Sequence, residues 1–329
     1  MVTGSSPLRS ATPVTIRPLY GADDLPTFNQ FDYVLNGEYA HDLDHKRRRP
    51  EWMWLALRDD RLVARAAWWG TPGAQRPLLM DVLDLDVAAP DRHHVGVELI
   101  GRALDAMGVA DSPPEYGRYL PAGWQDDPEQ VRTVTDRATV IEQLGGRLLV
   151  ERLRLQWGPG LNAPVDRHRL TFRPPAGRSE LLNLLTEILA STLDEHSRTE
   201  LRTKSPREVA TDQVDDEFPS YHGPRDWWAV GCLPDGGPVG LVIPSRNDYS
   251  WIIAYIGVLP EHRGHGYIDD LLDFGTRALA GAGAPFIKAS TDRSNTPMAA
   301  AFHRCGYPTA GEEIDYIFPS IPDARRQAE

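Results

Sequence analysis

A glycine-spaced turn at residues 263–268 has the composition of an anion site. The run reads Arg-Gly-His-Gly-Tyr-Ile, after an apolar segment and before a helical pattern. Gly264 and Gly266 permit backbone angles that side chains disfavour and let the main chain approach a ligand closely. Amide groups at a helix start favour negative charge, and Arg263 adds a positive one. The turn therefore predicts a site for the diphosphate of a phosphorylated cofactor; the alternative is a plain strand-to-helix connector.

Two other phosphate-binding patterns do not fit this turn. A Gly-Lys-Ser/Thr sequence does not follow it, which argues against hydrolysis of a magnesium nucleotide. The Gly-x-Gly-x-x-Gly order of dinucleotide-binding folds is not met, and the turn lies late in the chain.

The elements on either side would position the turn. Residues 251–258 are apolar and β-branched, which predicts a buried strand that Pro260 ends. A helix is predicted from Ile268 onward. Its apolar face comprises Ile268, Leu271, Leu272, Ala278 and Leu279. Its charged residues are expected to face water: Asp269, Asp270, Asp273 and Arg277.

This region resembles the GNAT superfamily of acyl-CoA-dependent N-acyltransferases, whose signature is Gln/Arg-x-x-Gly-x-Gly/Ala. Arg263 and Gly266 match its first and fourth positions, while Ile268 stands where the family has a small residue. The run from Asn295 to Tyr307 resembles the family's Asn-containing helix that ends in Gly-Phe/Tyr. The resemblance is clear over residues 166–319 and faint over residues 13–158.

The resemblance implies acetyl-CoA, or another short acyl-CoA, as cosubstrate. Main-chain groups of Ile256, Gly257 and Val258 would hold the pantetheine arm and polarise the thioester, as unpaired strand donors can. The residues that would wrap the diphosphate are Arg263, Gly264, His265, Gly266, Tyr267, Ile268 and Asp269. Asn295 would bind the cofactor, or else cap the following helix.

The general acid is less evident. In many family members a Tyr on the second helix protonates the leaving thiolate, and Phe302 takes its place here. Tyr255, Tyr307 and Tyr316 are candidates, although a tyrosine in an apolar strand such as Tyr255 is typical of a core ring. Cys305 could serve as a thiol acid or acyl carrier, or fill the core as a small apolar residue.

A base must free the lone pair of an attacking amine. The candidates are Glu195 and His196, and the acidic run Asp215, Asp216 and Glu217. A solvated loop cluster is the alternative for these groups.

The first half of the chain repeats the pattern of the second. Residues 78–87 read as a strand, and the spacing of residues 90–96 equals that of residues 260–266. His93 and His94 then replace Arg263 and Gly264, and Glu98 replaces Ile268, so the first copy should bind cofactor poorly. Residues 135–137 and 291–293 share the sequence Thr-Asp-Arg, and each run is expected to precede a helix, the first helix being the shorter.

The predicted fold class is α/β, or mixed α+β, with two tandem GNAT-like domains. Each would be a mixed, mostly antiparallel sheet flanked by helices, and hairpins are predicted at residues 52–69 and 227–243. The expected parts are a leader at 1–12, a degenerate domain at 13–158, a linker at 159–165, a catalytic domain at 166–319 and a tail at 320–329.

The composition limits the classes of partner that the protein could bind. A hydrophobic fraction of 41% favours a folded protein, and a net charge of −12 argues against a nucleic-acid partner. The sequence has no apolar run near the ~20 residues of a membrane helix, and with two cysteines and no export signal we expect a cytoplasmic protein without a membrane partner. The histidines lack metal-site spacing, so no metal is expected. A homodimer is compatible with the sequence.

The sequence therefore predicts an N-acetyltransferase that moves an acetyl or short acyl group from acyl-CoA to a primary amine of a small molecule, by direct attack in a ternary complex. Two alternatives stay open. One is a non-catalytic acyl-CoA-binding or sensor protein, and the other is an acyltransferase that acts on a hydroxyl group or a carrier-protein thioester.

Overall fold

The structure, a computed structural model, describes residues 13–161 and 164–319. The chain divides into two compact units. Unit 1 holds residues 13–119, 123–148 and 314–319, and unit 2 holds residues 120–122 and the described part of 149–313. The predicted leader and tail, and residues 162–163 of the predicted linker, lie outside the described residues. Residues 149–157, which the sequence analysis assigned to the first domain, belong to unit 2.

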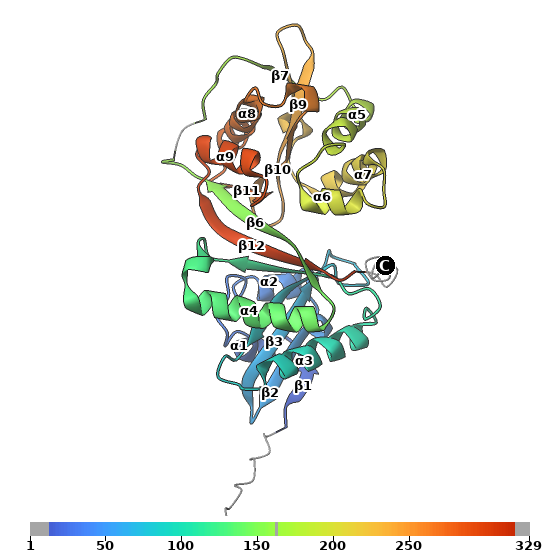
Figure 1. The fold of residues 1–329 in the computed structure, drawn as a ribbon, viewed down its shortest axis with the longest axis vertical. Coiled ribbons are helices and arrows are strands. Elements are labelled where there is room, and N and C mark those ends of the chain that lie inside the picture. The colour runs from blue at the N-terminus through green and yellow to red at the C-terminus, as the bar shows by residue number, and fades with distance from the viewer. Residues whose placement is uncertain (1–12, 162–163, 320–329) are drawn as a thin grey trace, which may run out of the picture. The chain divides into compact units, whose positions relative to one another are not determined.

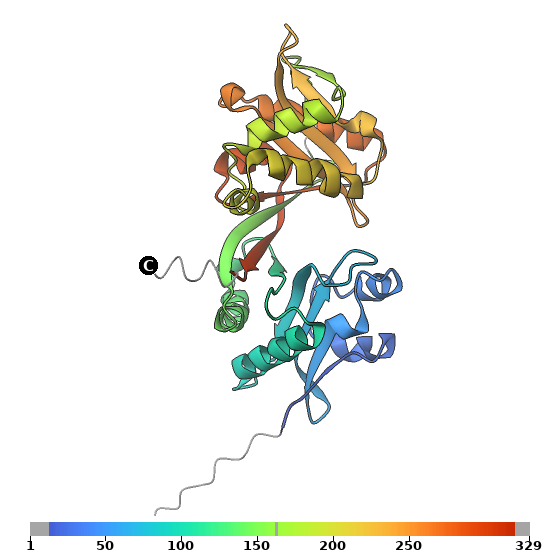
Figure 2. The ribbon, with the colours of Figure 1, turned by 90° about the vertical axis from the view of Figure 1, so that its right-hand side faces the viewer.

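Unit 1 is a sheet with helices on both faces. Its strands, in the spatial order β1-β2-β3-β4-β5, are antiparallel except for the parallel pair β4 and β5. The strands are β1 (Thr15–Pro18), β2 (Met53–Arg58), β3 (Arg61–Trp69), β4 (Leu79–Leu85) and β5 (Glu115–Leu120). The helices are α1 (Leu25–Phe28), α2 (Tyr39–Asp44), α3 (Arg92–Met107) and α4 (Pro128–Gln143). Helices α3 and α4 cover one face of the sheet, and α1 and α2 lie on the other (Figures 1 and 2).

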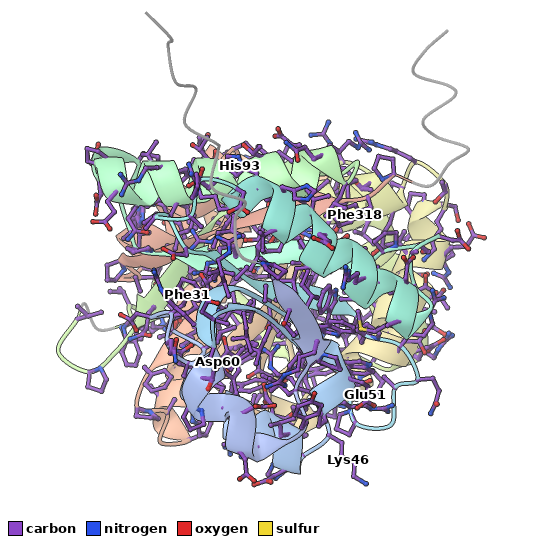
Figure 3. All side chains as sticks on the ribbon, turned by 90° about the horizontal axis from the view of Figure 1, so that it is seen from below. Phe31, Lys46, Glu51, Asp60, His93 and Phe318 are labelled. Carbon is purple, nitrogen blue, oxygen red and sulfur yellow. The ribbon has the colours of Figure 1, made fainter. Side chains whose placement is uncertain are left out.

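The hairpin of β2 and β3 confirms the first predicted hairpin. Leu57 pairs with Leu62 and Arg58 with Arg61, which leaves a two-residue turn. Its residues Asp59 and Asp60 have φ angles of 49° and 62°. Aspartate tolerates this left-handed region better than most residues do, which suits the turn. Asp60 is labelled in Figure 3, which shows unit 1 end-on.

Unit 2 repeats this arrangement. Its strands follow the order β12-β6-β11-β10-β9-β8-β7, and β10 and β11 are parallel. The strands are β6 (Arg147–Trp157), β7 (Thr171–Arg173), β8 (Ala229–Cys232), β9 (Pro238–Arg246), β10 (Trp251–Val258), β11 (Ile287–Asp292) and β12 (Thr309–Ile317). The helices are α5 (Arg178–Leu189), α6 (Glu195–Glu200), α7 (Pro206–Asp212), the π-helical turn η4 (Gln213–Glu217), the 3-10 turn η7 (Pro260–His262), α8 (Tyr267–Gly281) and α9 (Thr296–Arg304).

In unit 2, α5, α6 and α7 lie on one face of the sheet and α8 and α9 on the other (Figures 1 and 2). Along the chain, each copy of the fold runs from a first strand through helices into a three-stranded meander, then a helix, a parallel strand, a second helix and a last strand. The last strand of the first copy is β6, most of which lies in unit 2. This order confirms the predicted mixed α/β class with two copies of one fold.

The face of α8 that was predicted to meet water is buried. Its apolar face is in the core, as expected, since Leu271, Leu272 and Leu279 are 0% exposed. However, Asp269, Asp270 and Asp273 are only 8%, 4% and 2% exposed, respectively. Each forms an ion pair with an arginine outside the helix, and such pairing permits burial of a charge. The pairs are Asp269 with Arg304, Asp270 with Arg169, and Asp273 with Arg167.

Two of the predicted correspondences between the copies are wrong. Helix α3 begins at Arg92, so Gly96 lies inside it, where a Cβ atom would stand 2.9 Å from side-chain carbons of Leu85 and Val140. Residues 135–137 lie inside α4, which has 16 residues against nine in α9. Equal residue spacing misaligned the copies because unit 2 inserts η7 and the glycine turn before its helix.

The helices give no membrane span. Among the described residues, none of them combines the length and the apolar character that crossing a bilayer requires.

Candidate functional site

Strands β10 and β11 separate soon after they meet. Their one register pair in the described structure is Ile252 with Lys288. On its other side β10 stays paired with β9 as far as Val258, with a bulge between Ile253 and Tyr255. From Ile253 onward, the β11-facing edge of β10 therefore offers main-chain groups to whatever enters the gap.

A cavity of about 600 Å³ occupies this part of unit 2. On one side it is lined by the end of β10, the start of α8 and α9. On the other side it is lined by the end of α5, by α6 and by η4. Nine of the eleven predicted cofactor residues line it: Ile256, Gly257, Val258, Arg263, Gly264, Gly266, Tyr267, Ile268 and Asn295. The other two, His265 and Asp269, are not among its lining residues.

The glycine turn has the geometry that its sequence suggests. Gly264 and Gly266 have φ angles of 81° and 72°, which side chains rarely adopt. Gly266 is the N-cap of α8 and provides no side-chain cap, so the first amide groups of the helix can meet a ligand. An anion at this point would also interact favourably with the helix dipole.

Arg169, which precedes β7, binds the main chain of the glycine turn. Its guanidinium donates to the carbonyl oxygens of His265, at 3.0 Å, and Gly266, at 2.9 Å. The same group forms an ion pair with the buried Asp270. By fixing the two carbonyls, Arg169 fixes the direction of the amides on the opposite face of the turn. Sequence reasoning missed this residue, because about a hundred positions separate it from the turn.

The side chain of Arg263 binds protein rather than projecting freely into the cavity. It donates to the Val258 carbonyl at 3.1 Å, to Ser191 at 2.8 and 2.9 Å, and to the Ile188 carbonyl at 3.2 Å. Arg263 therefore caps the C-terminal end of α5 and joins it to the end of β10. The guanidinium that we expected to bind a diphosphate therefore holds these two elements together.

At the start of α9, Asn295 is an N-cap, and its side chain accepts a hydrogen bond from the Met298 amide at 3.4 Å. This confirms the capping alternative, and Asn295 also lines the cavity. Phe302 lines the cavity as well, is 2% exposed and packs edge-on against Tyr307. The wall formed by α9 is therefore apolar at this position.

The three tyrosines proposed as the acid lie in different places. Tyr307 is 0% exposed in the core, and its hydroxyl bonds to Thr276 at 2.7 Å. Tyr316 lies in the last part of β12, which belongs to unit 1, and is buried next to the ring of Tyr116. Tyr255 lines the cavity. Burial, with the nearby charge of Asp194, raises the pKa of Tyr255, so its hydroxyl keeps its proton at neutral pH.

Cys305 has a structural environment. The residue is 4% exposed, and its thiol points at the carbonyl of Asp269, 3.8 Å away. Burial and the carboxylate of Asp273 raise the pKa of Cys305 to about 12. The thiol is therefore protonated at neutral pH, which does not suit an acyl carrier.

The two base candidates on α6 are engaged with arginines. Glu195 pairs with Arg198 and Arg202 and is not among the residues that line the cavity. His196 lines it, but its Nδ1 atom lies 3.1 Å from Nη1 of Arg152. Because arginine only donates, this contact uses the lone pair of Nδ1 and places the proton of the neutral ring on Nε2.

Within the acidic run of η4, Glu217 is the residue that lines the cavity. Asp215 pairs with Arg178 on the surface, and Asp216 is exposed. The Glu217 carboxylate accepts a hydrogen bond from the hydroxyl of Tyr221 at 2.6 Å. Although Glu217 reaches solvent, the protein around its carboxyl group raises its pKa, and the nearby charges of other carboxylates add to this effect.

Arg152, on β6, is a second residue that sequence reasoning missed. It lines the cavity and lies 3.6 Å from carboxylate oxygens of both Asp194 and Asp292. Asp292 is 1% exposed, and burial, with the charge of Asp194, raises its pKa. Asp194 lines the cavity and caps α6 through the Ser197 amide.

No group of three or more His, Cys, Asp or Glu side chains within residues 13–161 and 164–319 is arranged to hold a metal.

The corresponding gap in unit 1 is bridged by side chains. Strands β4 and β5 pair at Leu79–Glu115 and Met80–Tyr116. Beyond these pairs, Arg118 of β5 donates to Asp84 of β4 at 3.0 Å. Arg137 of α4 donates to the same carboxylate at 2.8 Å and to the main-chain carbonyl of Leu83 at 2.7 Å. These hydrogen bonds occupy the edge of β4, whereas the corresponding edge of β10 in unit 2 is open.

The start of α3 in unit 1 also differs from that of α8. Its N-cap is Asp91, which forms an ion pair with Arg58, in place of a glycine. Arg92 and His93, the first helical residues, both contact Asp136 (His93 is labelled in Figure 3). A carboxylate already lies at this helix start, which supports the prediction that the first copy binds cofactor poorly.

Comparisons with known proteins agree with this geometry. Residues 191–307 match the model of the acetyltransferase (GNAT) family. A GCN5-related N-acetyltransferase from Sphaerobacter thermophilus has a similar structure, with a TM-score of 0.58, 16% identity, and coverage of 94% of this chain and 98% of that chain.

A second similar structure is the GCN5-related glucosamine N-acetyltransferase region of a fungal multi-domain GH3 beta-N-acetylglucosaminidase. Its TM-score is 0.56 at 14% identity, with 94% of this chain covered and 38% of that chain. No curated protein sequence matches the chain. At these identities the structural likeness shows the fold, and the family model identifies the domain. The match to the acetyltransferase (GNAT) family therefore covers residues 191–307, all of which lie in unit 2.

Proposed function

We propose that unit 2 transfers an acetyl or other short acyl group from acyl-CoA to a primary amine of a small molecule, by direct attack in a ternary complex. The observation that carries the proposal is the cavity between the separated strands. One side of it offers main-chain donors and an uncapped helix start, and the other side offers carboxylates. An anionic acyl donor and a basic acceptor could therefore enter from different sides.

The residues present fit an acyl-CoA. The amides at the start of α8, after Gly264 and Gly266, would hold its diphosphate. The free edge of β10 at Ile256, Gly257 and Val258 would bind the pantetheine arm and polarise the thioester carbonyl. When bound, the donor supplies an activated acyl group, and no other cofactor enters this proposal.

Two side chains that line the cavity could act as the general base and the general acid of the reaction. Glu217 carries a carboxylate whose pKa is raised by the surrounding protein, which makes it a stronger base than an ordinary glutamate. Tyr255 keeps its hydroxyl proton and could donate it to a leaving thiolate. Both line the cavity, whereas Tyr307 and Cys305 do not. Tyr255 thus replaces the acid that Phe302 cannot provide.

Phe302 supports a second candidate, a protein that binds acyl-CoA without turnover. Thiol release from acetyl-CoA in the presence of small primary amines separates the two. We expect release that depends on the amine. Tight binding of acetyl-CoA by calorimetry, with no release for any amine, would identify the sensor instead.

A further inference from the structure

The two ends of the cavity differ in charge. The end formed by α8 and α9 has no carboxylate among its lining residues. The end formed by α6 and η4 has three, from Asp194, Glu200 and Glu217. The family match does not account for this difference, because it identifies the domain and leaves the acceptor open.

The neighbouring cations do not neutralise the acidic end. Arg152 is 3.6 Å from Asp194 but equally close to Asp292, so one cation serves two carboxylates. Lys204 is 3.8 Å from Glu200 but bonds to Asp212 at 2.7 Å. Glu217 accepts a hydrogen bond from the neutral hydroxyl of Tyr221. The acidic end therefore keeps negative charge at the mouth of the cavity, where Asp194 is partly buried and Glu200 and Glu217 are exposed to solvent.

We propose that the acceptor is a diamine or polyamine: Glu217 takes a proton from the amino group that reacts, and Asp194 and Glu200 bind a second cationic group of the same molecule. This inference rests on the proposed function and names its acceptor class. Three separate carboxylates exceed what a single ammonium group needs. Asp194 caps the start of α6 and Glu200 is its last residue, whereas Glu217 belongs to η4, so the charges come from two elements.

The chemical step balances as follows. Glu217 accepts a proton from the ammonium form of the acceptor and frees its lone pair. The nitrogen forms a bond to the acyl carbon, and the bond from that carbon to sulfur breaks. The thiolate takes a proton from Tyr255, and the second proton that the nitrogen loses replaces it on the tyrosine. The products are an amide, a thiol and one proton, which Glu217 passes to solvent.

The test uses the full chain, acetyl-CoA and three acceptors that share a four-carbon chain. Diaminobutane carries a second cation, butylamine a methyl group, and aminobutanoate a carboxylate. We expect kcat/KM to be about tenfold higher for diaminobutane than for butylamine, because a charge-assisted contact stabilises by about that factor. Aminobutanoate should be the poorest acceptor.

Substitutions test which carboxylates cause the preference for diaminobutane over butylamine. Glu200→Gln should raise the KM for diaminobutane and leave that for butylamine unchanged, which narrows the ratio between the two acceptors. Asp194→Asn should act in the same direction, and because asparagine is also a good N-cap, α6 should keep its start. The matched control is Asp216→Asn, which removes an exposed carboxylate from the same turn as Glu217 and should leave the ratio unchanged.

The pH profile tests Glu217. The base works when ionised, so kcat/KM should fall as pH drops through a pKa above the usual glutamate range. Glu217→Gln should lower kcat about a hundredfold, within the usual contribution of a general base, and remove this acidic limb. The titratable groups that face Glu217 are Tyr221, Glu200, Asp194 and Tyr255, and the limb should persist in Tyr221→Phe.

The outcomes are distinct. Equal or better use of butylamine or aminobutanoate, with turnover intact, would overturn the inference and leave the proposed function standing. A ratio that Asp216→Asn changes as much as Glu200→Gln does would also overturn it. Absence of thiol release with all three acceptors would overturn the inference and the proposed function together.

Discussion

Arg169→Ala should loosen the anion turn and destabilise unit 2 together. The substitution removes two hydrogen bonds to the carbonyls of His265 and Gly266. It also leaves Asp270, which is 4% exposed, without its arginine partner. Breaking a buried ion pair costs about 3–5 kcal/mol. The Arg169 side chain is 38% exposed, so we take the lower end, about 3 kcal/mol.

Urea denaturation and calorimetry would measure the two effects. With a slope of about 2 kcal/mol per molar urea, the transition of unit 2 should shift by about 1.5 M. The affinity for coenzyme A should fall about tenfold or more, because the amides that face the diphosphate lose their fixed direction. Arg169→Ala combined with Asp270→Asn should recover part of the stability, since no charge is then buried alone.

The control is Arg173→Ala. Arg173 is in β7, near Arg169 in the chain, and pairs with Glu180 at the surface with 43% of its side chain exposed. A surface pair contributes about 0–1 kcal/mol, so stability and affinity should change little. The reasoning fails if Arg169→Ala destabilises unit 2 and yet binds coenzyme A as tightly as the wild-type protein. The turn would then hold its shape without this side chain.

Three further outcomes are expected. Gly264→Glu should abolish acetyl-CoA binding in a folded protein, whereas His94→Glu in unit 1 should leave binding intact; calorimetry showing equal losses would contradict a single working copy. Tyr255→Phe should lower kcat at least tenfold, as loss of a general acid does, while Tyr307→Phe should keep kcat and lose about 1 kcal/mol of stability in a thermal melt. Cys305, with a pKa of about 12, should resist alkylation at pH 8 until unit 2 unfolds, and labelling of the native protein would count against its burial.

Features that neighbouring residues encode were predicted well. The strand at 251–258 has the predicted bounds, since β-branched residues and Pro260 specify it locally. The helix after Gly266 begins one residue before the predicted Ile268. The glycine turn was also recognisable, because Gly264 and Gly266 have left-handed backbone angles that glycine adopts readily.

Features that depend on distant partners were not predicted. Asp270 looks like a solvent-facing residue until Arg169, 101 positions earlier, is placed beside it. Arg152 was missed because its strand precedes the predicted linker, although it belongs to unit 2. Tyr307 resembled a catalytic residue by its type and its place after the motif helix. Only the packing shows its hydroxyl bonded to Thr276 in the core.

The link formed by Arg263 has a kinetic consequence. This side chain links the glycine turn, which we propose to bind the diphosphate of the donor, to Ser191, where the chain leaves α5 toward α6. Ordering the loop around one ligand would thereby prepare the opposite wall for the other. Thermodynamic reciprocity requires that each ligand tighten the other by the same factor. Because differences in affinity lie mostly in the rate of release, each substrate should then leave more slowly while the other is bound, whichever arrives first.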